Sequence, residues 1–463
     1  MSARSEINMI DGSVFSKILR FSLPLVLTNL LQVLFNVADM VVVGRFSSVD
    51  GAVGAVGATT ALVALFNHMV FGASVGATVA VSNAVGSRDR EESERAVHTS
   101  LLIGLICGLI GAAVGVFSCR TVLVWMDSDP ALLAMSATYC RIYFAGMPFV
   151  AVLNYAVAVL RAKGDTTTPL IILAGAGVLN VILNIVFVAG FGMNVDGVAL
   201  ATVISNAAAM VAVMIVLSRD RSWCRFSFRK LRIDGRIARR VMGIGLPAGL
   251  QGALFAISNM FIQQAVNGFG VAVITGISIA SNLEGFAYVA EQAVATAALT
   301  FTGQNIGARR YDRLGRVARD SYFANILICG AVSVGIFLLR EVLARMYMND
   351  VTADTALILD TVTRCSCFRL LPCVLCGFME VGSALTRGLG RSTLSMVITL
   401  LGSCAFRVVW IQTVFAAYPK DWVLYIVMPI SWAITALAHL ICGTVLRRRF
   451  LREAHPLNPA NYI

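Results

Sequence analysis

Long apolar segments recur along the whole chain and constrain its fold more than any other feature. Twelve of them lie at residues 21–43, 52–81, 98–117, 137–160, 170–190, 198–218, 241–266, 273–303, 321–340, 356–385, 393–415 and 423–446. A bilayer core is about 30 Å thick, and about 20 helical residues cross it. Only 13% of the 463 residues are charged, and the mean hydropathy is +0.81. The sequence therefore predicts an all-α membrane protein with twelve transmembrane helices.

Basic residues are distributed unevenly between the two sides of these predicted spans. Of the 37 Lys and Arg residues, 28 lie in the N-terminal segment, the even-numbered loops and the C-terminal tail, and 5 lie in the opposite loops. Cytoplasmic loops of membrane proteins are enriched in Lys and Arg. We therefore expect both termini in the cytoplasm. The same topology accounts for the net charge of +12, so no nucleic-acid partner is needed.

Three motifs of the first half recur in the same order in the second half. FSLPLVLTNLLQVLFN is followed by a similar IGLPAGLQGALFAISN, VSNAVGSRDRE by TGQNIGARRYD, and LRAKGDTTTP by TRGLGRSTLS. An ordered set of matches indicates an internal repeat. Six spans per half is an even number, so both halves enter the membrane from the same side. This predicts two parallel six-helix lobes related by a pseudo-two-fold axis along the membrane normal.

The most basic segment, residues 219–240, separates the two copies of the repeat. We predict an N-lobe at 1–218, a cytoplasmic linker at 219–240, a C-lobe at 241–446 and a cytoplasmic tail at 447–463. The polar segments are short and contain neither a Walker A lysine motif nor H-E-x-x-H, so direct use of ATP and an enzymatic domain are not expected. An intramembrane enzyme would need paired catalytic groups at one depth, such as two Asp on adjacent spans. Asp39 is the only unambiguous mid-span Asp, so an intramembrane enzyme is not expected.

A polar stripe runs along the first span. Asn29, Gln32, Asn36 and Asp39 are spaced by three, four and three residues, which places them on one helix face. A charge at the bilayer centre costs roughly 2.5–3.5 kcal/mol on insertion scales, so a carboxylate there needs a partner or a water-filled cavity. The stripe is either a cation or proton site that lines a cavity, or a structural patch of interhelical hydrogen bonds.

The second half carries a different set of charges. Glu284 and Glu291 are seven residues apart and share a face of the eighth span, and Glu380 lies in the tenth. Arg369 and Arg407 are the expected neutralising partners. These residues form either a second coupling or substrate site, or structural ion pairs that hold spans eight, ten and eleven together.

Several other polar residues are expected to have structural roles. Asp360 and Arg364 are four residues apart and predict a local salt bridge, and His68 is expected to serve in packing rather than in proton transfer. The eleven cysteines show no disulfide framework. We interpret the densest group as small packing residues rather than metal ligands, and it comprises Cys365, Cys367, Cys373 and Cys376.

The repeated motifs resemble those of the multidrug and toxic compound extrusion (MATE) family, in the wider flippase-like (MOP) superfamily. The resemblance covers residues 12–450 and rests on LRFSLPLVLTNLLQ, NVADMVVVGRF, SNAVGSRDRE and RAKGDTTTP, then GLPAGLQ, SNLEGF, GQNIGARRYDR, MEVGSALTRGLGRS and RVVWI. It implies a secondary antiporter of the bacterial inner (plasma) membrane, exporting small cationic or amphipathic compounds in exchange for Na⁺ or H⁺ by alternating access. No cofactor is implied, and a monomer is expected to suffice.

The resemblance also assigns roles to residues. Asp39 matches the acidic residue that the family carries on the first span, with a possible Na⁺ ion there and Asn36 beside it. Asn180 matches a family asparagine, whereas Asn184 stands where many members have an aspartate. An amide can coordinate Na⁺ but cannot titrate, so Asp39 alone would supply the charge of this site.

The expected substrate cavity involves residues of spans one, two and seven, namely Gln32, Met40, Met69, Gln251, Phe255 and Asn259. The alternative function within the superfamily is a flippase for lipids or lipid-linked oligosaccharides. Such a protein needs a large, strongly basic cavity, and the few in-span charges here have mixed signs.

Overall fold

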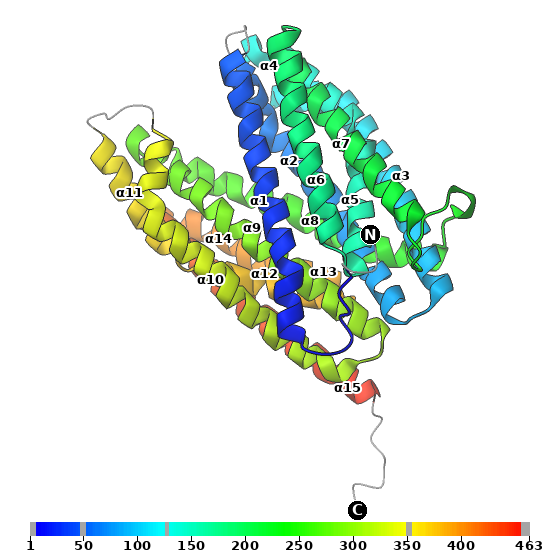
Figure 1. The fold of residues 1–463 in the computed structure, drawn as a ribbon. Coiled ribbons are helices and arrows are strands. Elements are labelled where there is room, and N and C mark those ends of the chain that lie inside the picture. The colour runs from blue at the N-terminus through cyan, green and yellow to red at the C-terminus, as the bar shows by residue number, and fades with distance from the viewer. Residues whose placement is uncertain (1–5, 47–51, 126–128, 349–353, 455–463) are drawn as a thin grey trace, which may run out of the picture. The chain divides into compact units, whose positions relative to one another are not determined.

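The computed structural model describes residues 6–46, 52–125, 129–348 and 354–454, and within these ranges all regular structure is helical (Figure 1). The first half contains α1 (Val14–Phe46), α2 (Ala52–Gly86), α3 (Arg90–Trp125), α4 (Pro130–Ala145), α5 (Met147–Ala162), α6 (Thr167–Asn184), the π-helix η1 (Ile185–Gly190) and α7 (Val195–Arg219). The short 3₁₀ helix η2 (Phe228–Lys230) follows.

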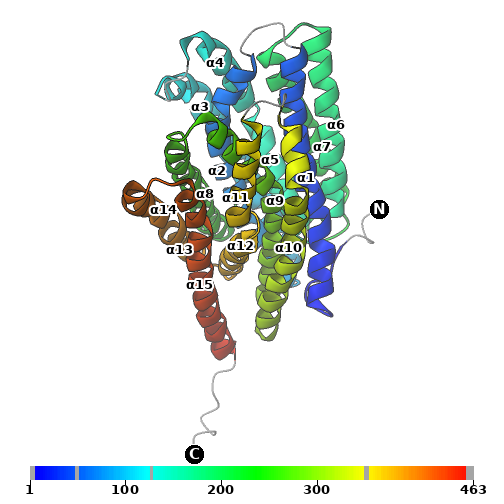
Figure 2. The same ribbon diagram turned by 90° about the vertical axis from the view of Figure 1, so that its left-hand side faces the viewer.

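The second half repeats this series. It contains α8 (Gly235–Val266), α9 (Val271–Gly307), η3 (Tyr311–Arg313), α10 (Leu314–Met346), α11 (Thr355–Arg369), α12 (Cys373–Gly388) and α13 (Ser392–Thr399). It ends with η4 (Leu400–Ala405), α14 (Phe406–Trp410), η5 (Ile411–Phe415) and α15 (Asp421–Ala454). The segments α13, α14 and α15 lie together in Figure 2, and both α13 and α14 contact α15.

Twelve membrane crossings are compatible with these helices. Ten are long and apolar enough to span a membrane, and two more arise if each bent pair counts as one span. The bends are 46° between α4 and α5 and 40° between α11 and α12. These pairs correspond to the predicted fourth and tenth spans. Several helices begin earlier than predicted, because hydropathy marks only the part of a helix that lies in lipid.

The two halves share one packing order, which confirms the internal repeat. In the first half α2 packs against α3, α4 and α5, while α4 and α5 pack against α7. In the second half α9 packs against α10, α11 and α12, while α11 and α12 pack against α15. The bent pair therefore occupies the same position in both halves.

Backbone conformations at the loops repeat as well. Arg88 and Arg309, which follow α2 and α9, both adopt the left-handed conformation with φ of 58° and 56°. Gly164 and Gly390, which follow α5 and α12, have φ of 103° and 78°. A positive φ is rare for arginine, so its recurrence at matching motif positions shows that the two loops are built alike.

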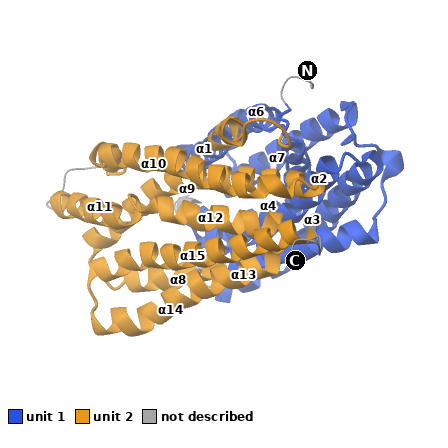
Figure 3. Cartoon of the chain, turned by 90° about the horizontal axis from the view of Figure 1, so that it is seen from below, with its two compact units in different colours: residues 1–8, 27–253 blue, residues 9–26, 254–463 orange. Residues whose placement is uncertain are grey.

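The chain divides into two compact units (Figure 3). Unit 1 comprises residues 1–8 and 27–253, and unit 2 comprises residues 9–26 and 254–463. The division falls inside α1 and α8, the opening helix of each half, so each of these helices contributes to both units. The lobe boundaries at 218 and 241 stay a prediction, and α8 already begins at Gly235, inside the predicted linker.

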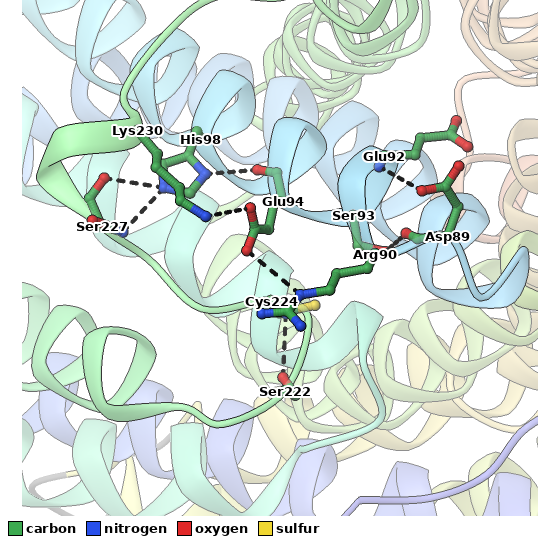
Figure 4. A network of polar contacts seen from close by, with 10 residues as sticks. All are labelled: Asp89, Arg90, Glu92, Ser93, Glu94, His98, Ser222, Cys224, Ser227 and Lys230. Atoms are coloured by element: carbon green, nitrogen blue, oxygen red, sulfur yellow. Dashed lines mark hydrogen bonds and ion pairs between the residues drawn. The ribbon is translucent and has the colours of Figure 1, made fainter.

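The segment between α7 and α8 is attached to unit 1 (Figure 4). His98 of α3 accepts the Ser227 backbone N–H on Nε2 at 3.0 Å, and its Nδ1 lies 2.6 Å from the Glu94 carbonyl oxygen. Lys230 donates to the Glu94 carboxylate at 2.7 Å. Phe226, which is 3% exposed, packs into the core of unit 1. His98 therefore anchors the segment.

Small residues bring α2 and the first part of α8 into close contact within unit 1. A Cβ placed on Gly72 would lie 2.3 Å from the Cα of Gly249, and a Cβ on Gly76 would lie 2.0 Å from the Val241 carbonyl oxygen. Only glycine fits at these crossings. Small residues let helix backbones approach closely in lipid, so these glycines set the distance between α2 and α8.

Candidate coupling and substrate sites

The carboxylate of Asp39 is held against α6. Asn184 donates from Nδ2 to Asp39 Oδ1 at 2.5 Å and also reaches Asn180 Oδ1 at 3.3 Å. Asn180 in turn donates to Thr202 Oγ1 of α7 at 3.4 Å. Residues from three helices of unit 1 thus form one polar chain, in which Asp39 is the negative group. Thr202 had no signal in the sequence that would distinguish it from a packing residue.

Burial and helix geometry single out Asn184 within this chain. Its side chain is fully buried, and its Oδ1 atom has no hydrogen-bond partner among the residues that the structure describes. Leaving a buried acceptor unsatisfied costs about 1–3 kcal/mol, so such an atom calls for an explanation. Asn184 is also the last residue of α6 before the π-helix η1, and π-helical insertions are frequent at functional sites.

The remaining first-half candidates lie on α1, α2 and α8. Gln32 and Asn36 are exposed on α1, whereas Met40 packs beside an apolar cluster built around Val42 and Val198. These side chains surround Asp39 along the helix. In the polar stripe predicted from the sequence, Gln32 and Asn36 are therefore exposed, whereas Asp39 is in contact with Asn184 of α6.

Met69 and Gln251 occupy different environments in unit 1. Met69 of α2 is 42% exposed, whereas Gln251 of α8 is 5% exposed and its Oε1 atom has no partner among the described residues. Met69 is therefore at the surface of the protein, whereas Gln251 is enclosed by its neighbours.

Arg407 forms the main polar contact of α14 in unit 2. It is 1% exposed, donates from Nε to Ser431 Oγ at 3.0 Å and from Nη1 to Asn259 Oδ1 at 3.3 Å. Its guanidinium carbon lies 5.0 Å from the centre of the Phe255 ring, within cation–π range. The sequence predicted that Arg407 neutralises a glutamate. Its hydrogen-bond partners among the described residues are neutral, and Glu284 interacts with it electrostatically. The neutral acceptors and the aromatic face therefore share in compensating the burial of this arginine.

Glu284 and Arg369 form the predicted ion pair. Arg369 Nη2 lies 2.5 Å from Glu284 Oε2, and Arg369 Nη1 donates to Ser281 Oγ at 3.0 Å. The two charged side chains are 15% and 13% exposed. The pair links α9 to the end of α11, so the expectation of an Arg369 partner on the glutamate face of α9 is confirmed. Ser281 precedes Glu284 by less than one turn and was not identified from the sequence.

The other two candidate glutamates of unit 2, Glu380 and Glu291, have different neighbours. Glu380 of α12 hydrogen-bonds to Gln292 of α9 and interacts electrostatically with Arg387. Glu291 is fully buried, and its Oε1 atom accepts hydrogen bonds from the thiols of Cys373 and Cys329. Glu284 and Glu291 both face the bent α11–α12 pair, as their seven-residue spacing predicted.

Together, the helical spans, the repeated packing order and the buried charges define a polytopic membrane protein with two related halves. The MatE family model matches residues 24–186 and 247–411, one block in each half. The chain belongs to the MatE family of membrane transporters and is not an enzyme.

Curated relatives match most of the chain. The probable multidrug resistance protein YoeA of Bacillus subtilis (strain 168) is 27% identical over 345 residues, which cover 73% of this chain and 74% of YoeA. The multidrug export protein MepA of Staphylococcus aureus (strain NCTC 8325 / PS 47) is 25% identical over 453 residues, 96% of each chain.

Solved structures share the fold. An outward-facing multidrug resistance MATE family transporter of the MOP superfamily superimposes with a TM-score of 0.88 at 20% identity, covering 98% of this chain and 100% of that one. A MOP superfamily transporter from Pyrococcus furiosus also gives 0.88, at 21% identity, covering 96% and 98%. These likenesses confirm the fold class predicted from the sequence.

Proposed function

We propose that this transporter exports small amphipathic or cationic organic compounds, as a multidrug efflux protein, in exchange for Na⁺ or H⁺. Relatives that span 96% of the chain are named multidrug export proteins, which supports the substrate class. The observation that carries the coupling proposal is the contact between Asp39 and Asn184 in unit 1.

The chemistry of this contact suits a small cation. A carboxylate and amide carbonyl groups are hard oxygen ligands, which hard cations prefer. Asp39 supplies the negative charge, and the unpartnered Oδ1 of Asn184 is a neutral ligand beside it. A proton on Asp39 would neutralise the same charge. In either case the bound ion removes the cost of an unpaired carboxylate within the membrane.

Exchange follows if a cationic substrate and the coupling ion compete for this charge. Binding of Na⁺ or H⁺ at Asp39 would weaken the attraction for an organic cation and favour its release. Transporters with internal repeats expose their sites alternately to the two sides of the membrane. The π-helix after Asn184 and the bend between α4 and α5 are the places in unit 1 where such a change would be accommodated.

The proposed setting is the bacterial plasma membrane, with both termini in the cytoplasm. The distribution of Lys and Arg along the chain supports this orientation, since 28 of the 37 fall on one side of the predicted spans. A monomer is sufficient for the proposed mechanism, because the groups of the Asp39 site all come from one chain.

The decisive experiment replaces Asp39 with Asn in a bacterial host that lacks its own efflux pumps. We expect Asp39→Asn to reduce resistance to cationic dyes and drugs to the level of the empty host, at unchanged expression, because the site loses its only charge. Asp360→Asn is the matched control, since Asp360 is 59% exposed and pairs locally with Arg364. Full resistance in the Asp39→Asn variant would contradict the proposal.

Transport assays with purified protein in liposomes distinguish Na⁺ from H⁺ as the coupling ion. They also distinguish export of organic cations from movement of lipids. Efflux of a fluorescent cation should respond to a Na⁺ gradient or to a pH gradient, and the response should be absent in Asp39→Asn. Movement of a fluorescent lipid between leaflets without cation transport would instead support a flippase.

A further inference from the structure

Three metal-ligating side chains meet inside unit 2. Glu291 of α9, Cys329 of α10 and Cys373 of α12 place their ligand atoms within 4.8 Å of one another. Glu291 Oε1 lies 2.7 Å from Cys373 Sγ and 3.4 Å from Cys329 Sγ. All three residues are at most 1% exposed.

The spacing of these atoms suits a tetrahedral ion. With Zn–S of about 2.3 Å and Zn–O of about 2.0 Å, tetrahedral ligand atoms lie about 3.5–3.8 Å apart. The 3.4 Å separation between Glu291 Oε1 and Cys329 Sγ is close to these values. The 2.7 Å separation between Glu291 Oε1 and Cys373 Sγ is shorter, so Cys373 would have to move away from the carboxylate when an ion binds. Cys376 lies three residues after Cys373, in a C-x-x-C sequence, but its sulfur is not among the ligand atoms that lie within 4.8 Å of one another.

A role in packing alone does not account for this cluster. Buried cysteines behave as small apolar residues and need no carboxylate beside them. Glu291 is fully buried, and its Oε2 atom has no hydrogen-bond partner among the residues that the structure describes. The neighbouring arginine, Arg369, is already engaged with Glu284. Among the described residues, Glu291 Oε2 is therefore an acceptor that no protein group uses.

We propose that Glu291, Cys329 and Cys373 bind a thiophilic divalent cation such as Zn²⁺ or Cd²⁺ through three protein ligands. Sulfur ligands distinguish this site from the oxygen ligands around Asp39, because soft thiolates select Zn²⁺-like ions over Na⁺. Each coordinating thiol releases its proton on binding. The ion would cross-link α9, α10 and α12 beside the bend between α11 and α12. The proposal is independent of the transport function proposed above.

The test measures metal bound to the full-length protein purified in detergent under reducing conditions. After incubation with Cd²⁺ and desalting, we expect about one ion per chain, detected by mass spectrometry of the metal and by thiolate-to-Cd²⁺ absorption in the ultraviolet. Cys329→Ser and Cys373→Ser should each weaken binding at least about tenfold, and Glu291→Gln should weaken it as well. Cys367→Ser is the matched control, because Cys367 is the exposed cysteine of the same region.

A measurement on the unmodified protein keeps the test valid if a variant fails to fold. Bound Cd²⁺ should protect Cys329 and Cys373 from alkylation by a membrane-permeant maleimide during partial unfolding, while Cys367 stays reactive. Bound Cd²⁺ should also raise the melting temperature. Metal content far below one ion per chain, or equal protection of Cys367, would overturn the proposal.

Discussion

At the scale of single residues, the buried charges of unit 2 differ in how they are compensated. Glu284 has a short ion pair with Arg369, whereas Glu291 has thiols, and Arg407 has neutral acceptors and the Phe255 ring. Removing one partner of a buried ion pair leaves the other charge uncompensated. The Glu284–Arg369 contact is therefore expected to be structural, which leaves Glu380 as the glutamate of unit 2 best suited to a coupling or substrate role.

A double-mutant cycle tests this assignment. Arg369→Met should destabilise the protein by about 3–5 kcal/mol, because it leaves Glu284 buried and unpaired, and Arg369→Met combined with Glu284→Gln should recover most of that loss. Thermal unfolding in detergent measures the stability, and drug resistance of the host measures function. A double variant that is stable but inactive would show instead that the pair takes part in transport.

The Lys163 contacts give a residue-scale prediction outside the membrane spans. Lys163 Nζ lies 2.5 Å from Asp220 Oδ2 and 2.9 Å from Glu6 Oε1. Burial alone would lower the pKa of Lys163, but its hydrogen bonds to Asp220 and Glu6 outweigh this and raise it. Burial alone would raise the pKa of Asp220, but the hydrogen bond from Lys163 prevails and lowers it.

A carboxylate whose pKa is lowered by folding stabilises the folded state at pH values above its ordinary pKa of about 4. This contribution is lost as the pH falls through the pKa that the carboxylate has in the folded state. The raised Lys163 pKa contributes below about 10.4 and is lost as the pH rises through its folded value. Asp220→Asn should thus cost about 1.5–3 kcal/mol near neutral pH, and the difference from the natural protein should shrink below about pH 4. Melting temperatures across this range measure the effect, and a difference that is independent of pH would contradict the explanation.

At the scale of elements, the contact between α2 and α8 depends on glycine. Gly72 and Gly249 approach so closely that a Cβ on Gly72 would lie 2.3 Å from backbone, whereas a Cβ on Gly57, also on α2, would meet nothing within 4 Å. The same substitution should therefore affect stability strongly at Gly72 and little at Gly57, although both are glycines of one helix.

Gly72→Val should destabilise the protein by about 1–3 kcal/mol or more, the cost typical of overpacking, because helix backbones cannot yield as a flexible side chain can. Gly57→Val should be nearly neutral. Thermal unfolding of the two purified variants measures the difference. Equal melting temperatures would show that α2 and α8 do not pack as the structure has them.

At the scale of the whole molecule, local patterns were sufficient for the plan of the fold. Twelve apolar segments and three repeated motifs predicted the helices and the repeat, because each signal lies within a stretch of about 20 residues. Hydropathy alone did not predict the bends within the α4–α5 and α11–α12 pairs, although a proline, Pro148 or Pro372, lies at each bend and makes a kink plausible. Hydropathy reports whether a segment prefers lipid, and it is insensitive to a change of direction within that segment.

The segment 219–240 shows the limit of a composition argument at this scale. Its nine Lys and Arg residues predicted a linker, yet Phe226, His98 and Lys163 hold it to unit 1. Charge density identified which side of the membrane the segment occupies in the predicted topology. Its attachment depends on a few apolar and hydrogen-bonding residues, and the average composition of the segment does not identify them.

The sequence by itself determined the class of protein, the number of spans, the repeat and the stripe that ends in Asp39, because these follow from periodicity along one helix or from local hydropathy. Only the tertiary structure decided the partners of each buried group. Asp39 meets Asn184 across 145 positions, and Glu291 meets Cys373 across 82. Such contacts depend on how helices cross, so cysteines that look like packing residues in the sequence become hydrogen-bond donors to a carboxylate only when α9, α10 and α12 come together.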